Sequence, residues 1–195
     1  MGRARTVAVV LALATFVAAC GRVGSGDIVT ESRSVGEFTA VDASGGIDLE
    51  LTIEPGAEPE VTVTFDDNIV DRVKTEVEDG TLRVEPGSNY RISGGGRFVS
   101  VVVPSLSHLE ASGGSDVVGR GEADTMSVDA GGGADVDLSE LVVGEMEVDT
   151  SGGSDVVVNV TGSVVGDASG GSDVTVVGNP QHVDIETSGG ADVHS

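Results

Sequence analysis

Residues 148–156 read Val-Asp-Thr-Ser-Gly-Gly-Ser-Asp-Val, and this pattern occurs six times along the chain. Its consensus is an aliphatic residue, an acid, alanine or threonine, serine or glycine, two glycines, a small residue, aspartate and a second aliphatic residue. The copies lie at residues 41–49, 109–117, 128–136, 148–156, 166–174 and 185–193. From the second copy onward they follow one another with a nearly constant period, and such regularity indicates a repeat architecture.

Each half of a repeat has the alternation of a β-strand. Met146, Val148 and Thr150 alternate with acids before the glycines, and Val156 and Val158 alternate with other residues after them. The glycine pair supplies backbone freedom at a sharp corner between the two strands, where we expect positive φ. The regular corner glycines are Gly113, Gly114, Gly132, Gly133, Gly152, Gly153, Gly170, Gly171, Gly189 and Gly190.

Coiling of the chain, with one repeat per turn, accounts for this pattern. Equivalent residues then stack at the normal strand separation of about 4.8 Å, so that Val128, Val148 and Ile185 form one inward column. Aromatic residues are missing after Phe98, which favours a narrow core of aliphatic columns over a β-sandwich. The sequence therefore predicts an all-β fold, a single-stranded parallel β-helix (β-solenoid) with rungs of about 19 residues.

The two halves of the predicted domain differ in regularity. Residues 33–98 are expected to form irregular N-terminal rungs and a cap, whereas residues 99–195 form the regular rungs. Strand-like stretches in the first part are residues 38–41, 49–53, 61–65 and 81–84.

The N-terminus has the pattern of an export signal. Arg3 and Arg5 precede an uncharged apolar run, residues 7–17, that is too short for a typical membrane-spanning helix. Residues 17–20 read Val-Ala-Ala-Cys, which resembles a bacterial lipobox, and Cys20 is the only cysteine of the chain. The alternatives are an ordinary secretory signal with a chance cysteine, or a short membrane anchor.

The lipobox resemblance implies a processed and lipid-anchored protein. The signal peptide, residues 1–19, would be removed, and Cys20 would carry a diacylglyceryl thioether. Two or more acyl chains make such attachment effectively stable, because each buried CH₂ contributes about 0.8 kcal/mol. Residues 20–32 would then be the lipidated cysteine and a flexible tether. The expected location is the outer side of the cytoplasmic membrane, and the membrane is the first expected partner.

Composition excludes several classes of protein. The chain of 195 residues has 10 basic and 33 acidic residues, for a net charge of −23. Nucleic acid is excluded as a partner because counterion release needs a Lys/Arg surface. A single cysteine excludes a disulfide framework, and frequent glycine excludes a coiled coil.

Three segments together resemble a known family. They read SRSVGEFTAVDASGGIDLEL at residues 32–51, TLRVEP at residues 81–86 and FVSVVVPSLSHLEASGGSDV at residues 98–117, before the later glycine repeats. This order resembles the putative auto-transporter adhesin head GIN domain family, over most of residues 33–195. The resemblance implies an exported protein, often a lipoprotein, with a right-handed β-helix; the family name suggests adhesion to an unidentified envelope or extracellular partner. It implies no catalytic residues.

Every corner is flanked by two acids that a solenoid would align in two columns. The pairs are Asp42/Asp48, Glu110/Asp116, Asp129/Asp135, Asp149/Asp155, Asp167/Asp173 and Glu186/Asp192. Carboxylates about 4.8 Å apart repel by about 0.9 kcal/mol in water, and Ca²⁺ would relieve that repulsion. The candidate cation ligands are Asp116, Asp135, Asp149, Asp155, Asp167 and Asp173. The alternative is that the acids are solvated and discourage edge pairing. The spacing also departs from the calcium-binding nonapeptide GGxGxDxUx.

Nothing else in the sequence indicates catalysis or a cofactor. Ser112, Ser151, Ser169 and Ser188 recur before the glycines, and a nucleophile there would need a base and an oxyanion hole. The three histidines occupy no common repeat position, so the serines are expected to hydrogen-bond local backbone. The sequence favours a non-catalytic cell-envelope lipoprotein that presents an acidic β-helix for binding, adhesion or scaffolding. The alternatives are a β-helix enzyme acting on polysaccharide and a calcium-stabilised surface adhesin.

Overall fold

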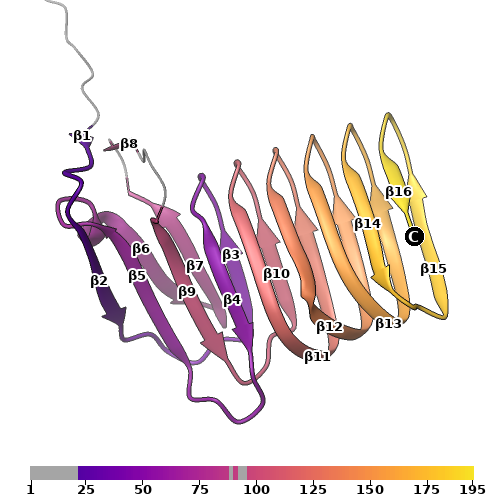
Figure 1. Cartoon of the computed structure of the whole chain (residues 1–195), viewed down its shortest axis with the longest axis horizontal. Coiled ribbons are helices and arrows are strands. Elements are labelled where there is room, and N and C mark those ends of the chain that lie inside the picture. The colour runs from indigo at the N-terminus through magenta and orange to yellow at the C-terminus, as the bar shows by residue number, and fades with distance from the viewer. Residues whose placement is uncertain (1–21, 88–89, 92–95) are drawn as a thin grey trace, which may run out of the picture.

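The computed structural model describes residues 22–87, 90–91 and 96–195. Within these ranges the chain is a β-solenoid, as predicted, with its turns stacked side by side (Figure 1). The predicted signal peptide, residues 1–19, and Cys20 lie outside the described residues. None of the described residues belongs to a helix long and apolar enough to cross a membrane.

Strands make up nearly all of the described chain. The elements are β1 (Arg22–Val23), β2 (Ile28–Arg33), β3 (Ala40–Ala43), β4 (Leu49–Ile53), β5 (Glu60–Asp66), the 3-10 turn η1 (Val70–Arg72), β6 (Val73–Glu78), β7 (Thr81–Pro86), β8 (Tyr90–Arg91), β9 (Phe98–Val103), β10 (His108–Ala111), β11 (Asp116–Ala130), β12 (Asp135–Thr150), β13 (Asp155–Ala168), β14 (Asp173–Gly178), β15 (His182–Thr187) and β16 (Asp192–His194).

The long strands β11, β12 and β13 each make one turn of the coil. Each leaves one glycine corner, bends round the opposite side of the solenoid and rises to the next corner (Figure 1). Neighbouring turns pair in parallel, and Val128 lies beside Val148 as the period predicts. Two register shifts between β12 and β13, near Leu138 and Val143, absorb the shorter spacing of the next copy.

The first copy of the pattern does not stack where its place in the sequence suggests. Its two strands, β3 and β4, lie between the rung made by β7 and β9 and the rung made by β10 and the start of β11. The backbone N–H of Ser112 donates to the Ala43 carbonyl at 2.9 Å, so the first two corners are direct neighbours. Residues 54–107 leave the rung made by β3 and β4 and form the next rung toward the N-terminal end. The chain then returns to the opposite side of the β3 and β4 rung, where β10 begins.

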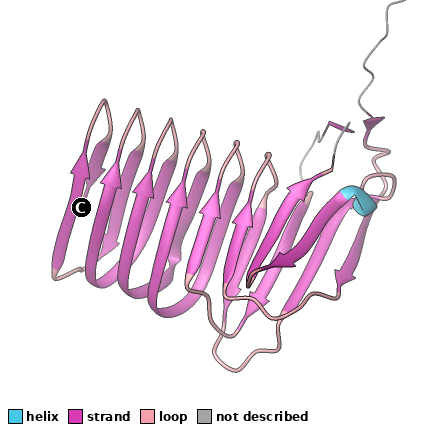
Figure 2. Cartoon of the chain, turned by 180° about the vertical axis from the view of Figure 1, so that it is seen from behind, coloured by secondary structure: helices cyan, strands magenta, loops and turns pink. Residues whose placement is uncertain are grey.

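This arrangement alters the expected organisation of residues 33–98. Residues 40–53 form a rung in the same register as the later ones, although the whole of residues 50–108 separates their repeat from the next copy. The cap consists of β2 and β5, antiparallel on one face, and of β6, antiparallel to β7 on the other (Figure 2).

The core consists of aliphatic columns. Val128 and Val148 are fully buried, and the pairing continues through Gly166 to the partly buried Ile185 in the last rung. In the cap, Phe65 is fully buried, so the larger side chains fill the wider end. The predicted narrow core without aromatic residues therefore belongs to the regular rungs.

Backbone contact between rungs explains the first glycine of each corner. Gly152 has φ of 81°, and a Cβ there would lie 3.0 Å from the nitrogen of Gly132 in the rung before. The expectation of positive φ for both glycines is wrong in the last three copies, where Gly153, Gly171 and Gly190 do not have it. In the last two, the second glycine's N–H instead donates to the preceding rung's first-glycine carbonyl, at 2.6–2.7 Å.

A buried ion pair joins the cap to the segment before β9. Asp66 is fully buried, and both oxygens of its carboxylate accept hydrogen bonds from the Arg97 guanidinium, one at 2.8 Å from Nη2. These bonds, with one from the Gly26 N–H at 2.7 Å, lower the pKa of Asp66 from 3.8 to about 2.

The expected flexible tether, residues 20–32, is wrong for its second half. Residues 28–32 belong to β2, which pairs with β5 along its whole length. The residues before β2 are also held: Ser25 Oγ donates to Asp67 at 2.6 Å, and a Cβ on Gly24 would collide with the Asp66 carboxylate. Composition suggested a free linker because it does not reveal the distant partners in the cap.

We expect the two glycines of one corner to respond differently to alanine. Gly152→Ala introduces a Cβ at positive φ and against the backbone of Gly132, and should destabilise the fold by about 1–3 kcal/mol. Gly153→Ala is the matched control, because no atom lies within 4 Å of its Cβ and its φ is not positive. It should be neutral or stabilising by up to about 1 kcal/mol. Urea unfolding of both variants measures this, and equal losses would contradict the corner-stacking argument.

We expect the ion pair to govern acid stability. Because the folded pKa of Asp66 is depressed, its contribution is complete above about pH 4 and is lost as the pH falls toward about 2. Asp66→Asn should cost about 3–5 kcal/mol at pH 7, since it leaves Arg97 buried without its carboxylate. The difference from the wild type should shrink in unfolding curves between pH 5 and pH 2. Glu85→Gln, which removes the exposed partner of Lys74, should cost only about 0.2–1 kcal/mol. A pH-independent Asp66→Asn deficit would refute the assignment.

Candidate functional site

The stacked corners form a ridge with a row of carboxylates on each side. On the side before the corner, the register brings one acid per rung into line, and we name this row the pre-corner ladder. Its members are Asp42, Glu110, Asp129, Asp149, Asp167 and Glu186. At the cap end, the next position in the row is Arg83 of β7. The predicted alignment of acids is therefore present, and it extends through the displaced first copy.

The second row lies on the other side of the ridge, and we name it the post-corner ladder. Its members are Asp48, Asp116, Asp135, Asp155, Asp173 and Asp192. All six are exposed. The pKa of Asp48 is raised by partial burial and, secondarily, by the charge of Asp116, which is the repulsion expected within such a row.

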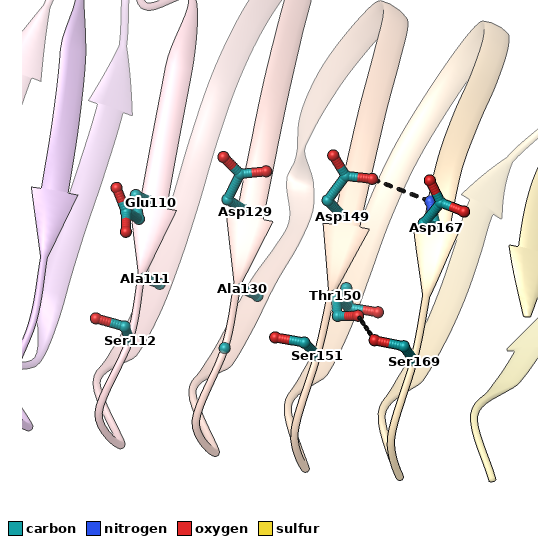
Figure 3. Close-up of a pocket in the computed structure, with 11 residues that line it drawn as sticks. Glu110, Ala111, Ser112, Asp129, Ala130, Asp149, Thr150, Ser151, Asp167 and Ser169 are labelled. Carbon is teal, nitrogen blue, oxygen red and sulfur yellow. Dashed lines mark hydrogen bonds between the residues drawn. The ribbon is translucent and has the colours of Figure 1, made fainter. Parts of the chain in front are cut away.

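Part of the pre-corner ladder lines a shallow groove. The groove has a volume of about 410 Å³ and runs across four rungs beside the ridge. Figure 3 shows Glu110, Asp129, Asp149 and Asp167 along it, one on each rung. Asp129 and Asp149 are half-buried, so the groove combines negative charge with partial shielding from water.

The groove contains few groups that balance its charge. Asp149 Oδ1 accepts a hydrogen bond from the Asp167 backbone N–H at 3.0 Å. Nε2 of His108 lies 3.6 Å from Asp129, and its Nδ1 shares a hydrogen bond with Ser127 Oγ at 2.8 Å. His108 is half-buried and does not line the groove itself, but it lies beside Asp129, which does.

The predicted cation ligands lie on opposite sides of the ridge. Asp116, Asp135, Asp155 and Asp173 lie in the post-corner ladder, whereas Asp149 and Asp167 lie in the pre-corner ladder. Among the described residues there is no group of three or more His, Cys, Asp or Glu side chains that could hold a metal ion. The structure thus aligns the acids without gathering them into a coordination shell.

The serines that close the corners follow the glycines, whereas the repeated serines predicted to hydrogen-bond local backbone precede them. Ser115, Ser154 and Ser172, directly after the glycines, are fully buried. Each donates its hydroxyl to the carbonyl three residues earlier, at 3.0–3.1 Å, and so closes the corner from inside. The signal was the alternation itself, since these serines share the inward phase of the valines that follow two residues later.

Among the serines before the glycines, Ser169 uses its hydroxyl to contact the backbone of a neighbouring rung. Ser169 Oγ donates to the Thr150 carbonyl in the rung before, at 3.2 Å (Figure 3). Its corner contains no histidine, because His108, His182 and His194 lie at different repeat positions on β10, β15 and β16. The Ser169 hydroxyl therefore bonds the backbone of the neighbouring rung, and not the local backbone as expected.

Comparison with known proteins identifies a family with which most of the chain can be matched. Residues 37–121 and 89–180 match the family model described as "Putative auto-transporter adhesin, head GIN domain". The chain belongs to this family. No curated protein matches the chain.

Several solved structures are similar to this family member. A putative adhesin from Bacteroides fragilis is 18% identical, with a TM-score of 0.54, over 89% of this chain and 99% of that one. A putative lipid binding protein from Parabacteroides distasonis (16%, TM-score 0.43) and a putative adhesin from Parabacteroides merdae (13%, TM-score 0.47) show the same coverage of both chains. At this identity the first structure supports the fold.

We expect calcium to act on this domain only as a screening salt. Repulsion within the ladders falls with ionic strength, so CaCl₂ and NaCl at matched ionic strength should raise the Tm equally. Thermal unfolding in each salt, with EDTA-treated protein as the reference, measures this. A larger Tm increase in millimolar CaCl₂ that Asp149→Asn abolishes would overturn the expectation and favour the calcium-stabilised adhesin.

Proposed function

We propose that this protein is a non-catalytic lipoprotein of the cell envelope, and that its acidic solenoid binds a partner for adhesion or scaffolding. It would be held at the outer side of the cytoplasmic membrane through a lipidated Cys20, as the lipobox at residues 17–20 suggests. The family's description as an adhesin head supports a binding role. In this proposal the ridge and its groove are the binding surface.

The observation that carries the proposal is that each side of the ridge has an acid on all six rungs. The post-corner ladder is aspartate in all six rungs, although its side chains are exposed and fill no core position. Two residues further along the same outward face, the rungs have Glu50, Val118, Asp137, Val157, Thr175 and His194. The fold therefore tolerates varied residues at outward positions, and a row of identical acids is not a general requirement of the coil.

The pre-corner ladder is the better candidate for contact with a partner. Four of its carboxylates line the groove, and the partial burial of Asp129 and Asp149 strengthens their interaction with a bound charge relative to a fully exposed row. A row of like charges attracts cationic partners from a distance and increases the association rate. The proposed partner thus presents repeated positive groups, such as a basic protein segment or an amino-bearing polymer.

We expect neutralisation of the groove to weaken partner capture. A variant with Asp129→Asn, Asp149→Asn and Asp167→Asn removes three charges that line it. At about 0.2–1 kcal/mol for each exposed charge pair, retention in a pull-down from envelope fractions should fall roughly tenfold.

A matched variant separates this effect from total charge. Asp135→Asn, Asp155→Asn and Asp173→Asn remove the same number of charges from the post-corner ladder. This variant should retain more partner than the groove variant. Equal loss in both would reduce the interaction to net charge, and undiminished capture by both would reject the groove. Cys20→Ala tests the anchor separately, because it should abolish membrane association and leave capture by the isolated domain intact.

A further inference from the structure

The segment that follows the proposed lipidation site is docked on the cap. Ser25 N–H donates to Asn68 Oδ1 at 3.1 Å, and Asn68 Nδ2 donates to the Val23 carbonyl at 3.1 Å. The Asp67 N–H donates to the Asp27 carbonyl at 2.9 Å. These bonds connect segments that are distant in sequence, because they join the start of the domain to the end of β5 and to the turn before η1.

The buried ion pair secures this docking from beneath. The Asp66 carboxylate that binds Arg97 also accepts the Gly26 N–H, and Gly24 lies close against it. Docking of the segment therefore depends on a part of the cap that is fully buried, and not only on exposed polar contacts. The chain leaves the domain at a fixed point on the cap, instead of through a free tether that extends to residue 32.

The number of residues between the anchor and this point is small. From Cys20 to Ser25 there are five residue steps, which span at most about 18 Å when fully extended. One face of the solenoid stacks nine strands, from β2 to β16, so its length is roughly 38 Å at the usual strand spacing. An anchor at Cys20 can thus hold the cap near a bilayer but cannot reach as far as the other end.

Charge distinguishes the two ends of the molecule. Residues 22–97 contain seven of the eight basic residues that follow Cys20, with sixteen acids, for a net charge of −9. Residues 98–195 contain one basic residue, Arg120, and seventeen acids, for a net charge of −16. In the cap, Lys74 is paired with Glu85 at 2.7 Å and Arg33 with Glu31 at 3.0 Å. The cap is therefore the end that an anionic bilayer repels least.

Of the six large apolar side chains that are exposed among the described residues, two lie at this end and four lie on the rungs beyond the cap. Val23 is 63% exposed and Ile28 is 43% exposed, on β1 and β2 respectively. Both flank the docked segment, where they could enter the interfacial region of a nearby bilayer at a small free-energy cost. The first rung of the ladders, made by β3 and β4, lies three strand spacings from β2, or roughly 14 Å. That distance exceeds the Debye length of about 8–10 Å at physiological salt.

We propose that the N-terminal cap is the membrane-facing surface of this protein, and that its partner surface there is the lipid bilayer. The docked segment holds the cap close to the headgroups, and the solenoid stands away from the membrane with both ladders beyond its screened field. This orientation rests on the proposed lipid anchor at Cys20. In this orientation the groove lies on the part of the solenoid that is away from the membrane, where a partner on another surface can reach it.

Energy transfer to the bilayer tests the orientation. The full chain with its signal is expressed in a lipoprotein-processing bacterium and reconstituted in phosphatidylglycerol-containing vesicles with a headgroup acceptor. Lipidation blocks the thiol of Cys20, so a single introduced cysteine takes the donor dye. Asp71→Cys places the dye on η1 in the cap, and Ser188→Cys places it on the last corner. Transfer should be several-fold higher from the cap. Equal or reversed transfer would overturn the orientation.

Two insertions test whether the short segment is what holds the cap close to the bilayer. About twelve Gly/Ser residues between Gly21 and Arg22 lengthen the free chain and should sharply lower transfer from the Asp71→Cys dye. The same insertion within the exposed loop at residues 54–59 is the control and should leave transfer unchanged. An unchanged signal from the first insertion would refute control by segment length. Loss of both dye variants from vesicles would instead show that the anchor itself is wrong, and would overturn the orientation with it.

Discussion

Close stacking of glycine corners at the spacing of β-strands is the constraint on which the rest of this structure depends. A Cβ on Gly113, Gly132 or Gly152 would lie 3.0–3.2 Å from a backbone nitrogen of the preceding rung. The corner can therefore stack only if every turn places its first glycine at the same point. This requirement fixes the register of each rung against the next, and with it which side chains point inward.

The ladders follow directly from that register. Once the corners are aligned, any residue type repeated at a fixed offset from the glycines becomes a row at strand spacing. For carboxylates this costs about 0.9 kcal/mol per neighbouring pair in water. The pKa of Asp48 is raised mainly by burial, and the charge of Asp116 adds to that increase. The fold withstands this repulsion because its cohesion comes from buried aliphatic columns and from Ser115, Ser154 and Ser172, which close the corners from inside.

The sequence predicted what depends on local period and missed what depends on distant partners. Fold class, corner positions and the column through Val128 and Val148 follow from the regular period of the glycine repeats. The position of the first copy could not be predicted, because residues 54–107 separate it from its neighbour and no period spans that gap. The same holds for Asp66 and Arg97, which are 31 residues apart in a region without repeats. The candidate groove could be predicted only in part. Its acids were identified from the repeat, but the ridge that separates the two ladders is visible only in the folded structure.

Freedom at outward positions is what makes the ladders informative about function. Inward positions must be small or aliphatic for the coil to close, so their regularity is explained by folding alone. Outward positions carry no such demand, as the mixture of Val118, Asp137 and Thr175 in one column shows. Six aspartates in the adjacent row therefore persist against their own repulsion and without a packing role. Solubility would be met by any mixture of polar residues, so it does not account for a carboxylate on every rung, and the proposed recognition of a cationic partner at the pre-corner groove is a role that would use charges in line.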